Sequence, residues 1–214
     1  MNSKILILCL ILPAISFAQL FGSNKVGIIK DNDGFTFIRK GPAQEATVID
    51  TLFTGEFFQF EPSDSSDWIK IYKMWNVNGY VHKSRIQDIN KLSRNVQKIY
   101  LDSIFKKEAF TYAKRINKWD GKTSGLYNFH ETKFVPSLHL FIKYMCDSFD
   151  ERLFRKLLDI LIIEEHSADE TPSTALGFIF RCYPQKVQLI VNEYSSPVIK
   201  DCLMLGKGNV GVKN

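Results

Sequence analysis

The sequence contains little glycine, proline, cysteine and tryptophan. Only 12 Gly and 7 Pro occur in 214 residues, which excludes collagen-like and low-complexity proteins because those need far more of both. Four cysteines are too few for a small disulfide-rich scaffold. With 3 Trp against 17 Phe and 8 Tyr, the aromatics favour packing and short strands over a sugar-stacking surface. Since 45% of the residues are hydrophobic, the chain is expected to bury a core.

Residues 1–18 have the pattern of an export signal. Lys4 precedes the apolar stretch Ile5 to Leu12, and the small residues Ser16 and Ala18 lie at its end. The pattern predicts a secretory signal peptide that is cleaved after Ala18. An N-terminal membrane anchor is the alternative, but the apolar run is too short to cross about 30 Å of hydrocarbon as a helix. We therefore expect a secreted, periplasmic protein with no integral membrane segment after cleavage.

Residues 19–89 show short apolar runs separated by turn residues, which is typical of a small all-β unit. The expected strands are 26–29, 35–38, 47–52, 57–60, 68–72 and 79–81. Asp33-Gly34 and Asn78-Gly79 are expected to supply the positive-φ positions of tight turns. Closing such strands into a barrel would remove exposed edges. The unit has eight basic and nine acidic side chains, so no nucleic-acid partner is expected.

Four ordered stretches within these strands form a recognisable pattern. They are Phe35–Arg39 with Gly41-Pro42, Val48–Leu52 with Gly55, Asp67–Ile71, and Gly79–Ile86. The pattern resembles the bacterial SH3-like (SH3b) domain family of exported envelope proteins. The resemblance implies a small SH3-like β-barrel that recognises peptide, either peptidoglycan stem peptide or an extended segment of an envelope protein. The chain departs from the family where Phe37 replaces asparagine, where Tyr80 replaces tryptophan, and where residues 73–77 lengthen a hairpin.

Exposed aromatics beside polar loops are the candidate ligand-binding residues of such a unit. They are Phe35, Phe37, Trp68, Trp75 and Tyr80. Phe37 and Trp68 fit the barrel core as well as they fit its surface. Trp75 lies inside the lengthened hairpin and fits either an exposed site or a contact with the following helices.

After Asn90 the apolar spacing changes to three and four, which predicts one long helix from about Lys91 to Asn117. Its polar face is basic, and the candidate basic patch comprises Lys91, Arg94, Lys98, Lys106, Lys107, Lys114 and Arg115. Such a face could bind an acidic lipid, a nucleic acid or an acidic protein. The alternative, which we favour, is an ordinary solvated face. Residues 90–130 thus comprise this helix and a loop.

Residues 131–205 are expected to form short helices, followed by a flexible tail at 206–214. The expected helices are 136–147, 151–165, 172–182, 185–194 and 197–205. Ser148 and Glu151 have capping-box spacing, and Gly206 is placed where the last helix ends. The arrangement suits a compact helical bundle or an alpha-alpha hairpin stack that is only vaguely similar to HEAT repeats. The fold class is therefore two-domain, all-β plus all-α.

Residues with the chemistry of catalysis or metal binding are scattered. Cys146, Cys182 and Cys202 lack the small neighbours of an activated thiol, and their odd count leaves open one disulfide with one further thiol, or three buried thiols. The four histidines form no metal-binding spacing. No cofactor, metal or enzyme activity is expected.

Three functional hypotheses follow from these patterns. The leading one is a non-enzymatic binding or adaptor protein of the cell envelope, whose SH3-like domain recognises peptide. The second is a periplasmic inhibitor or immunity protein that binds a toxin or hydrolase through its helical half. The third is a degenerate cell-wall hydrolase.

Overall fold

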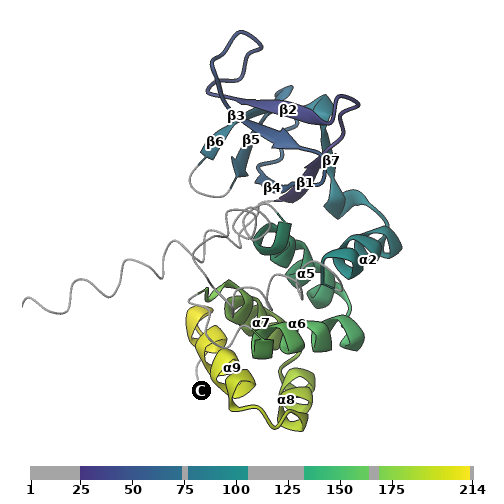
Figure 1. Cartoon of the computed structure of the whole chain (residues 1–214), viewed down its shortest axis with the longest axis vertical. Helices are drawn as coiled ribbons and strands as arrows, with labels where there is room; N and C mark the ends of the chain where they lie inside the picture. The colour runs from purple at the N-terminus through teal and green to yellow at the C-terminus, as the bar shows by residue number, and fades with distance from the viewer. Residues whose placement is uncertain (1–24, 74–76, 106–132, 164–168, 213–214) are drawn as a thin grey trace, which may run out of the picture.

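The computed structural model describes residues 25–73, 77–105, 133–163 and 169–212, and shows a β part followed by a helical part (Figure 1). The strands are β1 Lys25–Ile29, β2 Phe35–Arg39, β3 Val48–Phe53, β4 Phe57–Phe60, β5 Trp68–Lys73, β6 Val77–His82 and β7 Ile86–Asp88. The helices are α2 Arg94–Ser103, α5 Val135–Asp147, α6 Glu151–Ile163, α7 Thr171–Cys182, α8 Pro184–Glu193 and α9 Pro197–Asn209. The expected signal peptide lies outside the described residues.

The strands form one antiparallel sheet in the order β3-β2-β6-β5-β4-β1-β7. The six expected strands are confirmed to within two residues at each end, whereas the short strand β7 was not expected. The edge strands β3 and β7 do not pair with each other in the described part of the chain. The closed barrel therefore stays a prediction.

Two glycines that were expected in turns have different roles. Gly34 has a φ of 81° and occupies the expected turn before β2. Gly79 instead lies within β6, so the turn prediction for Asn78-Gly79 was wrong. A Cβ on Gly79 would lie 2.5 Å from Cγ2 of Ile38 and 2.6 Å from the carbonyl oxygen of Arg39. Glycine is required there because β6 passes close to β2.

Strand β4 separates two buried clusters because successive side chains point to opposite faces. Phe58 and Phe60 belong to the cluster within the β part. Phe57 belongs to a larger cluster that continues into the helices, and the amide of Gln59 lies 2.7 Å from Nε2 of His139 on α5. The β part and the helical part therefore share a continuous core.

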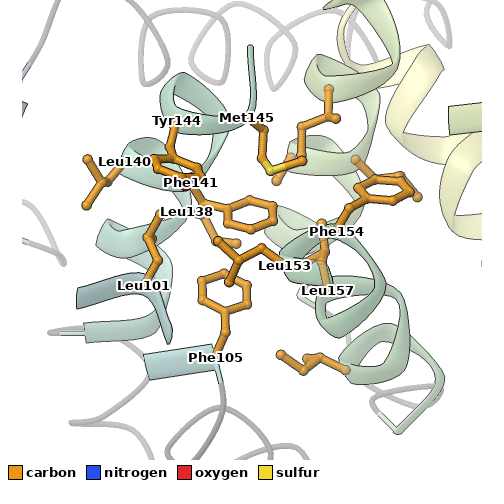
Figure 2. Packing of buried hydrophobic residues seen from close by; sticks show 14 of the residues in the cluster. Leu101, Phe105, Leu138, Leu140, Phe141, Tyr144, Met145, Leu153, Phe154 and Leu157 are labelled. Atoms are coloured by element: carbon orange, nitrogen blue, oxygen red, sulfur yellow. The ribbon is translucent and has the colours of Figure 1, made fainter. Parts of the chain in front are cut away.

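The larger cluster is centred on α5 and α6 (Figure 2). Phe141 stacks on Phe105 with ring centroids 4.6 Å apart, and Leu153 and Leu157 of α6 are fully buried. Apolar side chains cover much of the circumference of α6, and six of its residues are buried.

Several helix ends differ from expectation. The helix expected from Lys91 begins at Arg94, because residues 89–91 form a separate 3-10 turn; its expected continuation beyond residue 105 lies outside the described residues. At the start of α6 the cap is Asp150, whose carboxylate accepts the backbone N–H of Leu153 at 3.1 Å. The Ser148 capping box was therefore wrong.

The last helix does not end at Gly206. Helix α9 runs on to Asn209, so the expected helix end at Gly206 was wrong. Gly206 is buried against α7, and a Cβ on it would lie 1.9 Å from the carbonyl oxygen of Ser173. Because Gly206 has no side chain, the backbones of α7 and α9 can come into contact at this position. The glycine does not end the helix.

One disulfide joins the ends of α5 and α7. It links Cys146 to Cys182 with their Cα atoms 5.5 Å apart, and Cys202 is not part of it. Of the two alternatives that the cysteine count left open, the structure has the single disulfide. Among the helices that the structure describes, none is long and apolar enough to cross a membrane.

Candidate functional site

A groove on the outer surface of the β part brings aromatic and charged side chains together. Its volume is about 360 Å³. It lies between the turn that precedes β2, the strand β2 itself, the loop after it, and the adjoining ends of β5 and β6. Its lining residues are Asp31, Asp33, Phe35, Thr36, Phe37, Arg39, Gln44, Trp68, His82, Ser84 and Arg85.

One wall of the groove consists of two exposed phenylalanines on β2. Alternation along the strand turns Ile38 into the core, where it is fully buried, and leaves Phe35 38% and Phe37 42% exposed. Their rings meet edge to face with centroids 5.3 Å apart. Arg39 lies 6.0 Å from the centroid of Phe37 and donates a hydrogen bond to the carbonyl of Ala46 at 2.9 Å. This wall offers an apolar surface with a cation at its end.

The opposite wall contains Trp68 and His82, which face each other on the paired strands β5 and β6. Their rings meet edge to face at 5.5 Å. Nδ1 of His82 accepts hydrogen bonds from the backbone N–H of Ser84 at 3.4 Å and from its hydroxyl at 2.7 Å. These bonds assign the ring proton of the neutral imidazole to Nε2.

The turn before β2 is held by an ion pair. The side chain of Asp31 is only 3% exposed, and its carboxylate lies 2.6 Å from the guanidinium of Arg85. The same carboxylate accepts the backbone N–H of Asp33 at 3.1 Å. The carbonyl of Arg85 accepts the backbone N–H of Lys30 at 2.7 Å. The rim of the groove is therefore fixed to the β6–β7 connection.

The structure brings three of the five candidate aromatics into this groove: Phe35, Phe37 and Trp68. Tyr80 is half-buried on β6 opposite Arg39 and does not line it. Trp75 lies outside the described residues.

Four of the polar lining residues were missed because they lie outside the strands. Asp31 and Asp33 precede β2, while Ser84 and Arg85 follow β6. A search for polar residues in the turns next to the aromatic strands would have found them.

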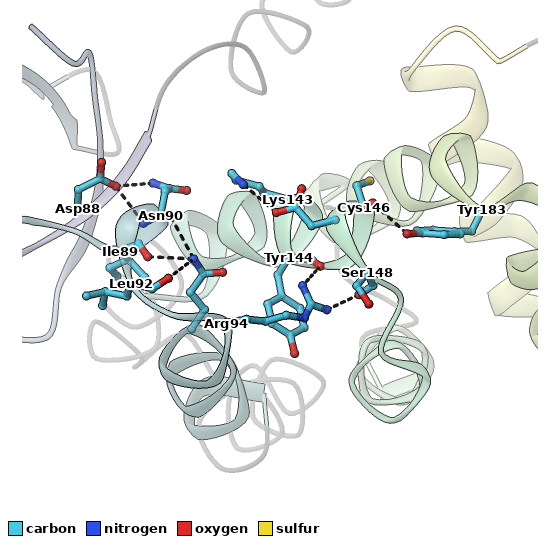
Figure 3. Close-up of polar contacts among 12 residues, drawn as sticks. Asp88, Ile89, Asn90, Leu92, Arg94, Lys143, Tyr144, Cys146, Ser148 and Tyr183 are labelled. Carbon is cyan, nitrogen blue, oxygen red and sulfur yellow. Dashed lines mark hydrogen bonds and ion pairs between the residues drawn. The ribbon is translucent and has the colours of Figure 1, made fainter.

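The residues of the candidate basic patch that the structure describes have different surroundings. Arg94 lies 3.6 Å from the ring centroid of Tyr144 and donates hydrogen bonds to the carbonyls of Tyr144 and Ser148 (Figure 3). Lys98 forms an ion pair with Asp150. Lys91 is exposed. Arg94 and Lys98 thus join α2 to the α5–α6 connection. Lys106, Lys107, Lys114 and Arg115 lie outside the described residues.

The edge strand β3 is protected by side chains. The N–H of Phe53 bonds to the carboxylate of Glu56 at 3.1 Å, and the carbonyl of Thr51 accepts a bond from the ammonium of Lys73 at 2.7 Å. Lys73 also forms ion pairs with Glu56 at 3.5 Å and with Asp50 at 3.2 Å. Because these side chains meet the backbone of β3, the edge is a poor template for a further strand.

Other chemistry is limited in the part of the chain that the structure describes. His, Cys, Asp and Glu side chains form no group of three that could hold a metal ion there. Cys146 and Cys182 are bonded to each other and are not available as nucleophiles. His139, on α5 beside β4, has its pKa lowered by burial to about 4, which keeps the imidazole neutral at pH 7.

The chain matches no protein-family model, no curated protein and no solved structure. Of the sites expected from the sequence, the groove is the place where several candidate residues meet.

Proposed function

We propose that the chain is a non-enzymatic, secreted periplasmic binding or adaptor protein whose SH3-like β-barrel holds an extended peptide. The ligand is either a peptidoglycan stem peptide or an extended segment of an envelope protein. The carrying observation is the groove of about 360 Å³ with exposed Phe35 and Phe37 on one wall and Trp68 on the other. Exposed aromatics beside convergent polar groups are typical of ligand sites.

The exposure of two neighbouring phenylalanine rings supports a binding role. Phe35 and Phe37 lie side by side on the surface with about two fifths of each exposed. Large apolar side chains that gather at a polar-rimmed groove mark interaction sites more often than scattered ones do. An extended peptide would cover both rings and place its backbone near the polar residues of the rim.

Retention of the full chain on purified peptidoglycan tests the wall version of this proposal. We expect Phe37→Ser to lower retention about tenfold, since it removes an aromatic contact from the groove. Phe53→Ser is the matched control, because Phe53 is 54% exposed on the neighbouring strand and does not line the groove. Equal retention of both variants would show that the groove is not the site.

A full chain that is not retained would exclude peptidoglycan as the ligand. Co-purification of a stoichiometric envelope protein, lost on Phe37→Ser, would then support the protein-segment version. A partner that is indifferent to Phe37→Ser but lost on Leu189→Asp would instead support an inhibitor that binds through the helices, since Leu189 is 65% exposed on α8.

A further inference from the structure

Two hydrogen-bond donors in the groove are not used by the described part of the chain. The backbone of Trp68 exchanges hydrogen bonds with the hydroxyl of Ser66, but its indole N–H bonds to no described residue. His82 uses Nδ1 to cap the turn at Ser84, and its Nε2–H likewise has no partner among the residues described. An indole N–H can only donate a hydrogen bond. A ligand that bonds to the wall formed by Trp68 and His82 therefore needs an acceptor.

One acceptor of the groove, the carboxylate of Asp31, is fully occupied. Both oxygens of Asp31 have partners, since one accepts the N–H of Asp33 and the other pairs with Arg85 at 2.6 Å. Arg39 gives one N–H to Ala46 and keeps others, because a guanidinium has five. Asp33 is the remaining carboxylate and lies exposed on the rim. The groove therefore keeps N–H donors on Trp68, His82 and Arg39 that the described residues leave unused, while Asp33, Thr36 and Gln44 supply its acceptors.

We propose that the Trp68–His82 wall binds the terminal carboxylate of a short extended peptide, while Phe35 and Phe37 contact its apolar portion. Trp68 and His82 both line the groove, and their ring centroids are 5.5 Å apart. Their two N–H groups are therefore carried by neighbouring rings of one wall, as binding the two oxygens of one carboxylate would require. A volume of about 360 Å³ is at the small end of ligand pockets, which favours a peptide end over a long segment. This inference rests on the proposed function and names the ligand group that the groove selects.

Nuclear magnetic resonance on the full chain can separate this inference from the proposed function. The probe is a pool of peptides Ac-Ala-X-X-Ala, randomised at X without Asp or Glu and made with a free carboxylate or with a terminal amide. We expect the free carboxylate pool to shift the indole N–H signal of Trp68 and to bind about tenfold more tightly than the amide pool, as for one charge-assisted hydrogen bond.

Two variants remove one donor each and keep the surrounding structure. Trp68→Phe keeps an aromatic ring but loses the N–H. His82→Asn keeps an acceptor for Ser84, while its shorter amide has no donor at the position of Nε2. Each should reduce the preference for the carboxylate to about twofold or less. Tyr80→Phe is the control, because Tyr80 does not line the groove, and its preference should stay unchanged. The backbone amide spectrum of each variant verifies its fold.

The outcomes are distinct. Equal binding of both pools would overturn the carboxylate inference and leave the peptide groove standing. Persistence of the preference in folded Trp68→Phe and His82→Asn would also overturn it, since the carboxylate would then be bound elsewhere. Lack of binding by either pool, together with no retention on peptidoglycan and no captured protein partner, would count against the proposed function itself.

Discussion

The contact between α7 and α9 should fail when a single methyl group is added to it. A Cβ on Gly206 would lie 1.9 Å from the carbonyl oxygen of Ser173 and 2.9 Å from the backbone nitrogen of Gly177. The converse also holds, because a Cβ on Gly177 would lie 2.1 Å from the carbonyl oxygen of Gly206. Both obstacles are backbone atoms, so a change of rotamer cannot relieve them.

The expected magnitude follows from two opposing effects. Replacing a helical glycine with alanine gains about 0.5–1 kcal/mol by restricting the unfolded chain. Against this, Gly206→Ala requires the helices to separate by at least about 1 Å, and overpacking costs about 1–3 kcal/mol, with the upper end expected here because the obstacle is backbone. The separation would also loosen the buried side chains Ile199 and Leu203 of α9. We expect a net loss of about 2 kcal/mol in the free energy of unfolding.

Urea unfolding followed by circular dichroism, with the disulfide intact, measures this loss. Gly208→Ala is the matched control, because it lies in the same helix and a Cβ there would meet no atom within 4 Å. That variant should be as stable as the wild type or more stable by about 0.5 kcal/mol. If Gly206→Ala unfolds at the same urea concentration as Gly208→Ala, the close approach of α7 and α9 is refuted.

Two further perturbations test the buried polar contacts. Burial lowers the pKa of His139 from 6.5 to about 4, so the unfolded chain binds a proton that the folded one does not, and stability falls as pH drops through this window. Because of this residue, the free energy of unfolding measured in urea should be about 2 kcal/mol lower at pH 5 than at pH 7.5. The variant His139→Gln should lose this contribution to the pH dependence. Lys73→Met should lower thermal stability by about 2 kcal/mol, since it strips the cation from the 9% exposed side chain of Glu56. Lys83→Met, which removes an exposed pair with Asp67, should leave the melting temperature unchanged.

Local patterns predicted the strands and helices well, and non-local packing caused the errors. Alternation and turn residues located β4 at 57–60 without error, because both signals are carried by adjacent residues. Gly79 and Gly206 were both misread as chain-turning residues. Each is glycine because a distant backbone passes close to it, and nothing in the neighbouring sequence indicates such an approach.

The candidate site was predicted only in part, because local patterns indicate its strand residues but not the contacts between distant segments. Phe35, Phe37 and Trp68 follow strand patterns and proved to share the groove. The pair Asp31 and Arg85 was missed because it joins segments separated by more than fifty residues, and its geometry depends on how the turn before β2 meets the end of β6. Sequence spacing alone does not relate such segments.

The shared core makes the β part and the helical part depend on each other for stability. Val26, Ile28 and Phe57 lie in the same buried cluster as α5 and α6, and Gln59 meets His139 across the same boundary. A fragment that ends at residue 89 would expose these apolar side chains to water, at a cost of about 1.5–3 kcal/mol for each. The β part is therefore not expected to be stable alone, and binding experiments require the full chain. Because the boundary is a packed core rather than a linker, a ligand in the groove and a partner on the helices would be held in one fixed geometry.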